Sequence, residues 1–295
     1  MKRLRVLGIL FPLICVAALF LTPKDVATKT NTSTTSAKTV LAYKGFDLNE
    51  YPGDDALAPL KKTFSFTNYW LSPPPGEKRT TWLGKRRLLE SRGFGFAVLY
   101  LGPDSRRLKD VAAAEQKGAL AGENAAKLAH QEGFVPGTVI FLDIEEGGRL
   151  PAAYHAYLKR WTEVLQHAGF RAGAYCSAMP VAEGQGAFIT TAQDIENRLG
   201  PNRVELWVYN DACPPSPGCV FPATAPDVKL GGFASAKIWQ YAQSPRRKEF
   251  TAQCAATYNA DGNCYAPEDE KHKWFLDANT ATSGNPSGPE ETNAR

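Results

Sequence analysis

The segment Thr138-Val-Ile-Phe-Leu-Asp143-Ile-Glu145-Glu146-Gly147-Gly148 decides the fold and points to a site. Its apolar run predicts a buried strand, and the two glycines predict the turn that ends it. Residues i and i+2 of a strand share a face, so Asp143 and Glu145 project together while Ile144 points the other way. Ionising two neighbouring carboxylates at the end of an apolar strand is costly. We therefore interpret them as a functional pair, one carboxyl neutral and one ionised, and Glu146 as a solvated side chain.

Similar segments, rich in aromatic and β-branched residues, recur along the chain about every 30 residues. Seven more predicted strands are Tyr43–Leu48, Thr63–Leu71, Gly95–Leu101, Ala172–Ser177, Val204–Tyr209, Ala236–Tyr241 and Lys273–Asp277. Helical patterns fall between some of them. Such alternation predicts βα units around a parallel sheet, and eight units in about 250 residues have the size of a (β/α)₈ barrel.

The helical signal is uneven along the chain. An apolar stripe predicts a helix over Pro151–Ala168, and an Ala-rich segment predicts another over Val111–Gln131. By contrast, Asn210–Ser235 contains five prolines without a helical period, and Ser244–His272 is similarly irregular. We therefore expect a single, irregular barrel in which helices are missing among the last three strands. A doubly wound open sheet is the alternative fold.

The two ends of the chain differ in composition from the predicted barrel, which occupies residues 41–279. Residues 1–22 combine a basic start with an apolar run and predict a signal peptide or an N-terminal anchor. Residues 23–40 are rich in Thr and Ser and predict a disordered linker, and residues 280–295 predict a disordered tail. The net charge of +4 includes Lys2, Arg3 and Arg5, so the remaining chain is nearly neutral and does not suggest a nucleic-acid surface.

Five cysteines follow the predicted export segment, which favours disulfides in an oxidising compartment. Their spacing suggests two short-range pairs, Cys213 with Cys219 and Cys254 with Cys264. Cys176 lies in an apolar run, and we expect it to be a buried, unreactive thiol. No cysteine or histidine spacing indicates a metal site, and no cofactor motif is present.

Carboxylates end two further predicted strands, the first and the last. Asp47 follows Gly45-Phe46, and Asp277 follows Phe275-Leu276. In a parallel barrel the first and last strands are neighbours, and all strands end at the face where barrel active sites lie. We therefore predict that Asp47, Asp143, Glu145 and Asp277 share one pocket. Polar and aromatic side chains near the strand ends suit a carbohydrate. The candidate sugar-binding residues are Tyr100, Tyr175, Trp207, Tyr209, Trp239, Gln240 and Asn279.

The motifs GFD, FLDIE, AYCS, LWVYN, IWQY and FLDAN, taken in this order, resemble a glycoside-hydrolase-like barrel family of unknown function. That family is similar to the family 25 muramidases, which are lysozymes. The resemblance covers Leu41 to Asn279. It implies that Glu145 matches the catalytic acid and Asp143 its partner, while Asp47 and Asp277 match two acids that position the sugar.

This sequence departs from the muramidase pattern at two places. Tyr51-Pro52-Gly53 stands where those enzymes usually have Gln-Gly, and Asn68–Leu71 lacks the Lys and Glu that usually end their second strand. We therefore hold two hypotheses. The first is an exported, monomeric hydrolase of a β-linked glycan, most plausibly peptidoglycan, without a cofactor. The second is a non-catalytic glycan-binding protein of the cell envelope. A divalent cation held by the four acids is a weaker third.

Overall fold

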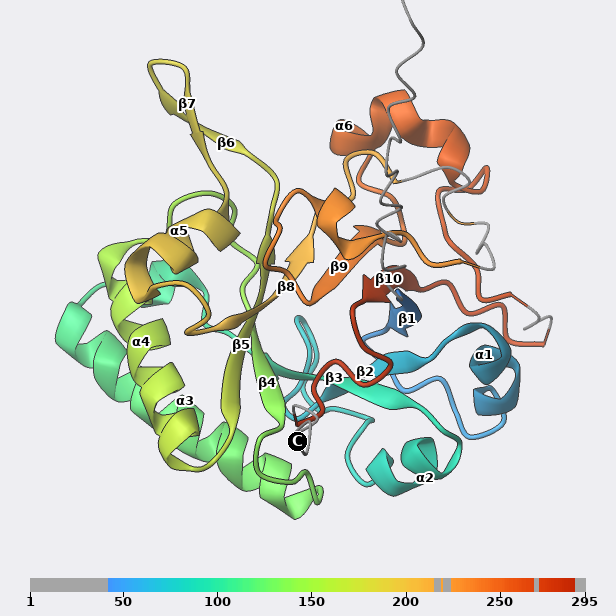
Figure 1. Cartoon of the computed structure of the whole chain (residues 1–295), viewed down its shortest axis with the longest axis horizontal. Coiled ribbons are helices and arrows are strands. Elements are labelled where there is room, and N and C mark those ends of the chain that lie inside the picture. Colours follow the sequence, from blue (N-terminus) through green and yellow to red (C-terminus); the bar gives the residue numbers. More distant parts are fainter. Residues whose placement is uncertain (1–41, 215–218, 220–223, 268–270, 290–295) are drawn as a thin grey trace, which may run out of the picture. The chain divides into compact units, whose positions relative to one another are not determined.

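Residues 42–214, 219, 224–267 and 271–289 are described by the computed structural model. The predicted export segment and linker, and residues 290–295 of the predicted tail, lie outside the described residues. Eight strands form a closed barrel in the order β1-β10-β9-β8-β5-β4-β3-β2 (Figure 1). This confirms the predicted barrel and excludes the open sheet.

The barrel strands alternate with helices through the first two thirds of the described chain. They are β1 Tyr43–Asp47, β2 Phe66–Trp70, β3 Gly95–Leu101, β4 Val139–Asp143, β5 Arg171–Ser177, β8 Glu205–Tyr209, β9 Ile238–Ala242 and β10 Asp277–Ala281. Adjacent barrel strands are parallel except for β10, which runs antiparallel to both of its neighbours.

The last strand corrects the sequence-based prediction. Lys273–Asp277 was predicted as a strand parallel to the first, but β10 begins at Asp277. Asp277 pairs in register with Asp47 at the end of β1. Because β10 is antiparallel, its start lies at the end of the barrel where the parallel strands finish. The prediction therefore placed Asp277 at the correct face for the wrong reason.

Helices cover the outside of the barrel unevenly. The α-helices are α1 Leu57–Thr63, α2 Arg86–Ser91, α3 Val111–Gln131, α4 Ala152–His167, α5 Thr191–Leu199 and α6 Lys248–Thr251. Short 3₁₀ helices are η1 Ser105–Arg107, η2 Val228–Gly231 and η3 Ala252–Thr257. No helix among the described residues is long and apolar enough to cross a membrane.

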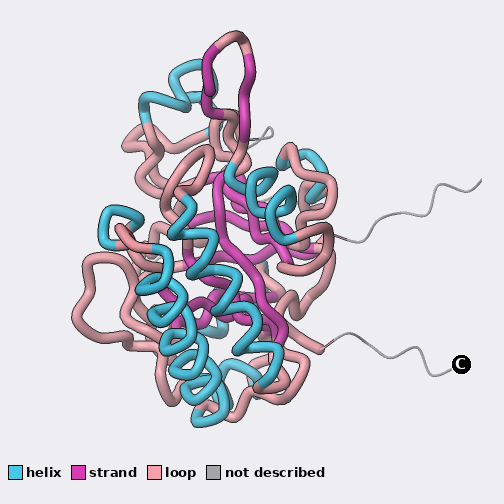
Figure 2. Tube along the Cα trace, turned by 90° about the vertical axis from the view of Figure 1, so that its left-hand side faces the viewer, coloured by secondary structure: helices cyan, strands magenta, loops and turns pink. Residues whose placement is uncertain are grey.

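The two long helices, α3 and α4, were both predicted from sequence and pack side by side along the barrel (Figure 2). The side chain of Asp110 accepts a hydrogen bond from the Ala113 N–H and caps the start of α3. In α4 the predicted apolar stripe is buried, with Leu158 and Trp161 fully covered. Burial of this face holds α4 against α3 and β5.

The connections among the last strands are loops with short helical pieces, as predicted. Only η2 lies between β8 and β9 in the described residues, and only α6 and η3 lie between β9 and β10. Before them, a two-stranded hairpin, β6 Val181–Gly184 and β7 Ala187–Ile189, projects away from the barrel (Figure 1).

Two disulfides join these connections, and their pairing differs from the prediction. Cys213 bonds to Cys254, and Cys219 bonds to Cys264. The short-range pairing is wrong because the loop after β8 packs against the loop after β9, which brings cysteines from different loops together. Cys176 is free and buried, and burial raises the pKa of its thiol.

The barrel interior is closely packed near the starts of the parallel strands. A Cβ at Gly45 would lie 2.2 Å from the Phe66 ring, so a glycine is needed for that ring to enter the interior.

The prediction of a disordered tail is wrong for residues 280–289. Strand β10 includes Thr280 and Ala281, and Ser287 is buried and bonds to the backbone of β3 and β4. The pairing of β3 with β4 begins only at Val98 and Ile140, so the tail supplies hydrogen-bond partners where these two strands separate.

Candidate functional site

A cavity of about 310 Å³ opens where the parallel strands end. All four predicted acids line it, coming from β1, from β4 and the loop after it, and from β10. The other lining residues are Asn49, Trp70, Pro75, Leu99, Tyr175, Trp207, Gln240 and Gln243. The strand ends that were predicted to meet therefore do meet in one hollow.

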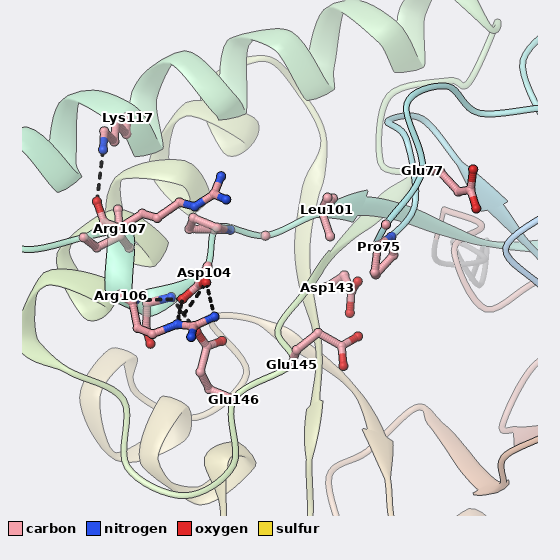
Figure 3. A pocket seen from close by; sticks show the side chains of 15 residues that line it. Pro75, Glu77, Leu101, Asp104, Arg106, Arg107, Lys117, Asp143, Glu145 and Glu146 are labelled. Atoms are coloured by element: carbon pink, nitrogen blue, oxygen red, sulfur yellow. Dashed lines mark hydrogen bonds and ion pairs between the residues drawn. The ribbon is translucent and has the colours of Figure 1, made fainter. Parts of the chain in front are cut away.

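Asp143 and Glu145 lie together but in different environments. Asp143 is 3% exposed, and neither of its carboxyl oxygens has a hydrogen-bond donor among the described residues. Glu145 is exposed, and both side chains point to the same side (Figure 3). Burial, and next the charge of Glu145, raise the pKa of Asp143 well above its ordinary value. Asp143 therefore favours its protonated form beside the Glu145 side chain.

The backbone around Asp143 fixes the pair firmly. The Asp143 carbonyl accepts a hydrogen bond of 2.9 Å from the Gly102 N–H, and the Ile144 N–H donates to the Tyr175 carbonyl at 2.9 Å. A Cβ at position 102 would lie 2.2 Å from the Asp143 carbonyl oxygen, so only glycine allows this close approach. Ile144 is fully buried on the opposite face. The strand geometry therefore continues as far as the pair.

Glu146 is not the freely solvated side chain that the sequence suggested. It is half-buried, and its carboxylate accepts a hydrogen bond of 2.5 Å from the Ser105 N–H at the start of η1. In Figure 3 it points toward the Asp104–Arg106 pair and away from Glu145. Glu146 therefore stabilises the loop after β3.

Gln240 organises the other half of the cavity. Its amide Nε2 donates to Asp47 at 3.0 Å and to Asp277 at 3.2 Å. Its Oε1 accepts from the Tyr175 hydroxyl and from Gln243, each at 2.8 Å. All the hydrogen-bonding positions of this buried amide are used, so its orientation is fixed.

Asp47 and Asp277 are held by amides rather than by cations. Asn279 donates to Asp47 at 2.5 Å, and the Ser244 N–H donates to Asp277 at 2.6 Å. Burial raises the pKa of Asp47 to about 6, although the bonds from Gln240 and Asn279 oppose the rise. Burial, and next the charge of Asp47, raise the pKa of Asp277 well above its ordinary value. Asp47, Asp143 and Asp277 therefore retain their protons to a higher pH than isolated aspartic acids do.

Three of the predicted aromatic residues stand at this site. Tyr175 and Trp207 line the cavity with ring centroids 5.2 Å apart, and Tyr209 packs against Tyr175 at 5.3 Å. The Trp207 indole N–H donates to Asn279 Oδ1 at 2.9 Å, so this ring holds the amide that bonds to Asp47.

Two predicted aromatic residues, Tyr100 and Trp239, lie elsewhere. Tyr100 accepts a hydrogen bond of 3.0 Å from Asn124 of α3, on the outside of the barrel. Trp239 packs on Gly231 of η2, and its indole N–H donates to the Asn210 carbonyl at 3.0 Å. Each is one residue out of phase with the side chains that face the interior, and strand alternation reverses the face at every residue.

Sequence reasoning missed Gln243 and Ser244, and Trp70, although it is an aromatic residue near a predicted strand end, was not among the candidate sugar-binding residues. Gln243 and Ser244 follow β9 in an irregular loop, where neither a strand period nor a helix period indicates direction. Trp70 belongs to the strand predicted from Thr63 to Leu71, and its position at the end of β2 was the available signal.

A second cavity, of about 890 Å³, continues from the first. Pro75, Asp143 and Glu145 line both, so the acid pair stands between two hollows. The second hollow extends over the loop after β3 and reaches Arg107 and Lys117 (Figure 3). A long ligand could therefore pass over the acid pair and occupy both sides.

A metal centre is not visible in the described part of the chain, where no group of three or more His, Cys, Asp or Glu side chains could hold an ion. His155 has a structural partner: it bonds to the buried Asp194 at 2.8 Å, and Asp194 also accepts a hydrogen bond from the Leu150 N–H.

One family model matches part of the chain. Residues 81–210 match the family model described as Rv2525c-like, glycoside hydrolase-like domain, which confirms the resemblance seen in the sequence motifs. Comparison with curated proteins gives no match.

Several solved structures are similar to the chain. An uncharacterized B. stearothermophilus protein is 17% identical, with a TM-score of 0.49 over 81% of this chain and 95% of that one. The Mycobacterium tuberculosis Tat-secreted protein Rv2525c, in complex with HEPES, is 15% identical, with a TM-score of 0.47 over 85% and 98%. A muramidase from Acremonium alcalophilum is 14% identical, with a TM-score of 0.43 over 80% and 92%.

Proposed function

We propose that this chain, whose residues 81–210 carry an Rv2525c-like, glycoside hydrolase-like domain, is a hydrolase of a β-linked glycan, with peptidoglycan as the substrate. The observation that carries the proposal is the unequal pair, in which Asp143 is buried without a donor beside the exposed Glu145. Burying a carboxyl group without a donor is costly, and acids perturbed in this way cluster at catalytic sites.

The pair can supply the proton and the negative charge that glycoside cleavage needs. The proton that Asp143 holds moves to Glu145, and Glu145 donates it to the leaving oxygen as the glycosidic bond breaks. Asp143 is then ionised, and its negative charge stabilises the positive charge that develops on the sugar ring. An acetamido oxygen of the substrate attacks the anomeric carbon, and Glu145 later takes a proton from the water that opens the resulting ring.

The amide network sets the position of the sugar in this scheme. Asp47 and Asp277, fixed by Gln240 and Asn279, present oxygens that accept hydrogen bonds from sugar hydroxyls. Tyr175 and Trp207 offer ring surfaces that a sugar face can contact. These residues would act by positioning, while Glu145 and Asp143 would act on the reacting atoms.

The two disulfides support an exported location for this activity. They persist in oxidising compartments and are rare in the cytosol. An enzyme that acts on a cell-envelope glycan must also reach that compartment, so the proposed substrate and the cysteine chemistry agree.

Glu145→Gln is the direct test of catalysis. The amide cannot donate a catalytic proton, so release of reducing ends from purified peptidoglycan should fall about 10²–10⁴-fold. Glu146→Gln is the matched control, since it makes the same change one residue away in a side chain bonded to Ser105. It should retain near wild-type turnover, and both variants should unfold at the wild-type temperature. Equal turnover by Glu145→Gln and wild type would reject the assignment.

A non-catalytic glycan-binding protein is the second candidate. The observation that favours it is the end of β2, where Tyr69 is buried and Trp70 lines the cavity in place of the Lys and Glu of the muramidase pattern. In that case wild type and Glu145→Gln should both sediment with insoluble peptidoglycan, and neither should release reducing ends.

A further inference from the structure

The second cavity, beside the acid pair, has side chains of opposite charge at its two ends. Glu77 stands near Pro75 and the acid pair, whereas Arg107 and Lys117 lie on the far side, across the loop after β3 (Figure 3). All of these residues line the same hollow. A ligand that crosses the acid pair would therefore meet acidic groups first and basic groups beyond them.

The basic groups of this cavity are not equally available. Arg106 is paired with Asp104, at 2.6 Å between Nη2 and Oδ2, and the charge of Glu146 also acts on it. Arg107 has no ion pair within the described chain, and it is exposed. Lys117 is also exposed and bonds only to the Arg107 carbonyl, at 3.1 Å. Arg107 and Lys117 therefore line the hollow as exposed cations without a direct ion pair among the described residues, although the charge of Asp104 also acts on Arg107.

The position of these two cations is defined by the fold. Lys117 lies in the second turn of α3, a long helix packed against α4. Its bond to the Arg107 carbonyl ties the end of η1 to this helix. The loop is further held by the bond between Ser105 and Glu146. Arg107 and Lys117 therefore lie on the same side of the hollow, across from Glu77 (Figure 3).

We propose that Arg107 and Lys117 form an oxyanion subsite that binds a carboxylate or phosphate carried by the glycan, beyond the sugar held at the acid pair. The inference rests on the proposed glycan function and extends it from a sugar polymer to an anionic one. Guanidinium and ammonium groups together provide hydrogen bonds and charge to such an oxyanion. The paired Arg106 is not part of the subsite.

Binding to purified peptidoglycan tests the proposal. The parent is Glu145→Gln, so that the polymer stays intact, and it is compared with a double variant that adds Arg107→Glu and Lys117→Glu. The matched control adds Lys109→Glu and Lys127→Glu, two exposed lysines that do not line the cavity. Each protein is titrated against untreated polymer, polymer stripped of phosphate-bearing chains, and polymer whose carboxylates have been converted to amides.

The double variant should bind the untreated polymer about tenfold more weakly than the parent, because two exposed attractions become repulsions. The control should bind like the parent. If the difference disappears on the amidated polymer, the oxyanion is a carboxylate; if it disappears on the phosphate-stripped polymer, it is a phosphate. Equal binding of the double variant and the parent to untreated polymer would overturn the subsite. If the parent binds none of the polymers, the proposed glycan function itself is wrong, and the subsite falls with it.

Discussion

The barrel wall is built in two different ways. In the helical half, defined as residues 66–177, strands β2 to β5 alternate with helices, and the two long helices α3 and α4 pack closely on each other. In the C-terminal third, residues 205–289, strands β8 to β10 are joined by loops whose helical pieces have four to six residues. Two disulfides connect those loops. Loops bury less apolar surface than long helices, so covalent links take over the role that packing has elsewhere.

The same division separates the two kinds of polar group at the site. The helical half supplies Asp143 and Glu145, and the Asp143 carboxyl has no hydrogen-bond donor among the described residues. The C-terminal third supplies Gln240, Asn279 and Asp277, whose hydrogen bonds are nearly all occupied. Groups that must change their proton state are left open, while groups that must hold a position are tied down.

Trp161→Ala should lower the unfolding free energy of the helical half more than any of the other substitutions does. Trp161 is fully buried in α4, and loss of a buried Trp side chain costs about 3–5 kcal/mol of unfolding free energy. Urea unfolding followed by circular dichroism should show a lower midpoint with an unchanged slope. Since the two regions share one closed barrel, the C-terminal third should unfold in the same transition.

Lys159→Ala is the control for this change. Lys159 lies in the same helix with an exposed side chain, so its removal should shift the midpoint little. A separate, later transition for the C-terminal third in Trp161→Ala would show that the disulfide-linked region is stable on its own, contrary to this prediction.

The two regions also differ in how far sequence reasoning could describe them. The bounds of α3 follow directly from its Ala-rich pattern and the Asp110 cap, and β3 and β4 follow from their apolar runs. These signals are local, so a sequence contains them. The pairing of Cys213 with Cys254 depends on how two loops meet, which no local period specifies.

At the site, the sequence predicted the positions of the acidic residues better than those of the aromatic residues. Asp143 and Glu145 share a face by strand alternation, and this held because β4 keeps its geometry up to Ile144. The prediction that Tyr100 binds the sugar did not take the strand face into account. The alternation of Gly95–Leu101 would have placed Tyr100 on the outer face, where it bonds to Asn124. Gln243 could not be found, since only the folded loop after β9 directs its amide to Gln240.

The disulfides of the C-terminal third should give the next largest effect. Replacing Cys213 and Cys254 with Ser opens a link across 41 residues, which we expect to cost about 3 kcal/mol. Hydrogen exchange should speed up in the loop after β9, where Ser244 bonds to Asp277, before it speeds up in α3 or α4. Glycan binding should weaken together with that loop.

Cys176→Ser is the matched control, because this buried cysteine forms no disulfide and lies in β5. It should lower stability through the buried hydroxyl without selectively exposing the loop after β9 to exchange. Uniformly faster exchange throughout the barrel in the Cys213→Ser/Cys254→Ser variant would contradict a local role for this disulfide.

The smallest effect concerns the protons of the amide-held acids. Folding raises the pKa of Asp47 from an ordinary 3.8 to about 6, so the folded protein binds this proton more tightly than the unfolded chain does. The stabilisation from that proton is complete below about pH 4 and is lost as the pH rises through 6. Asp47→Asn removes this contribution. The unfolding free energy of the variant should therefore fall less between pH 4 and 7 than that of wild type, by about 2 kcal/mol.

Asp54→Asn is the control, because hydrogen bonding to Lys85 lowers the pKa of that exposed carboxyl, so its effect on the pH dependence of stability has the opposite sign. Equal pH slopes for Asp47→Asn and wild type in urea titrations would show that Asp47 binds its proton no more tightly in the fold than in the unfolded chain.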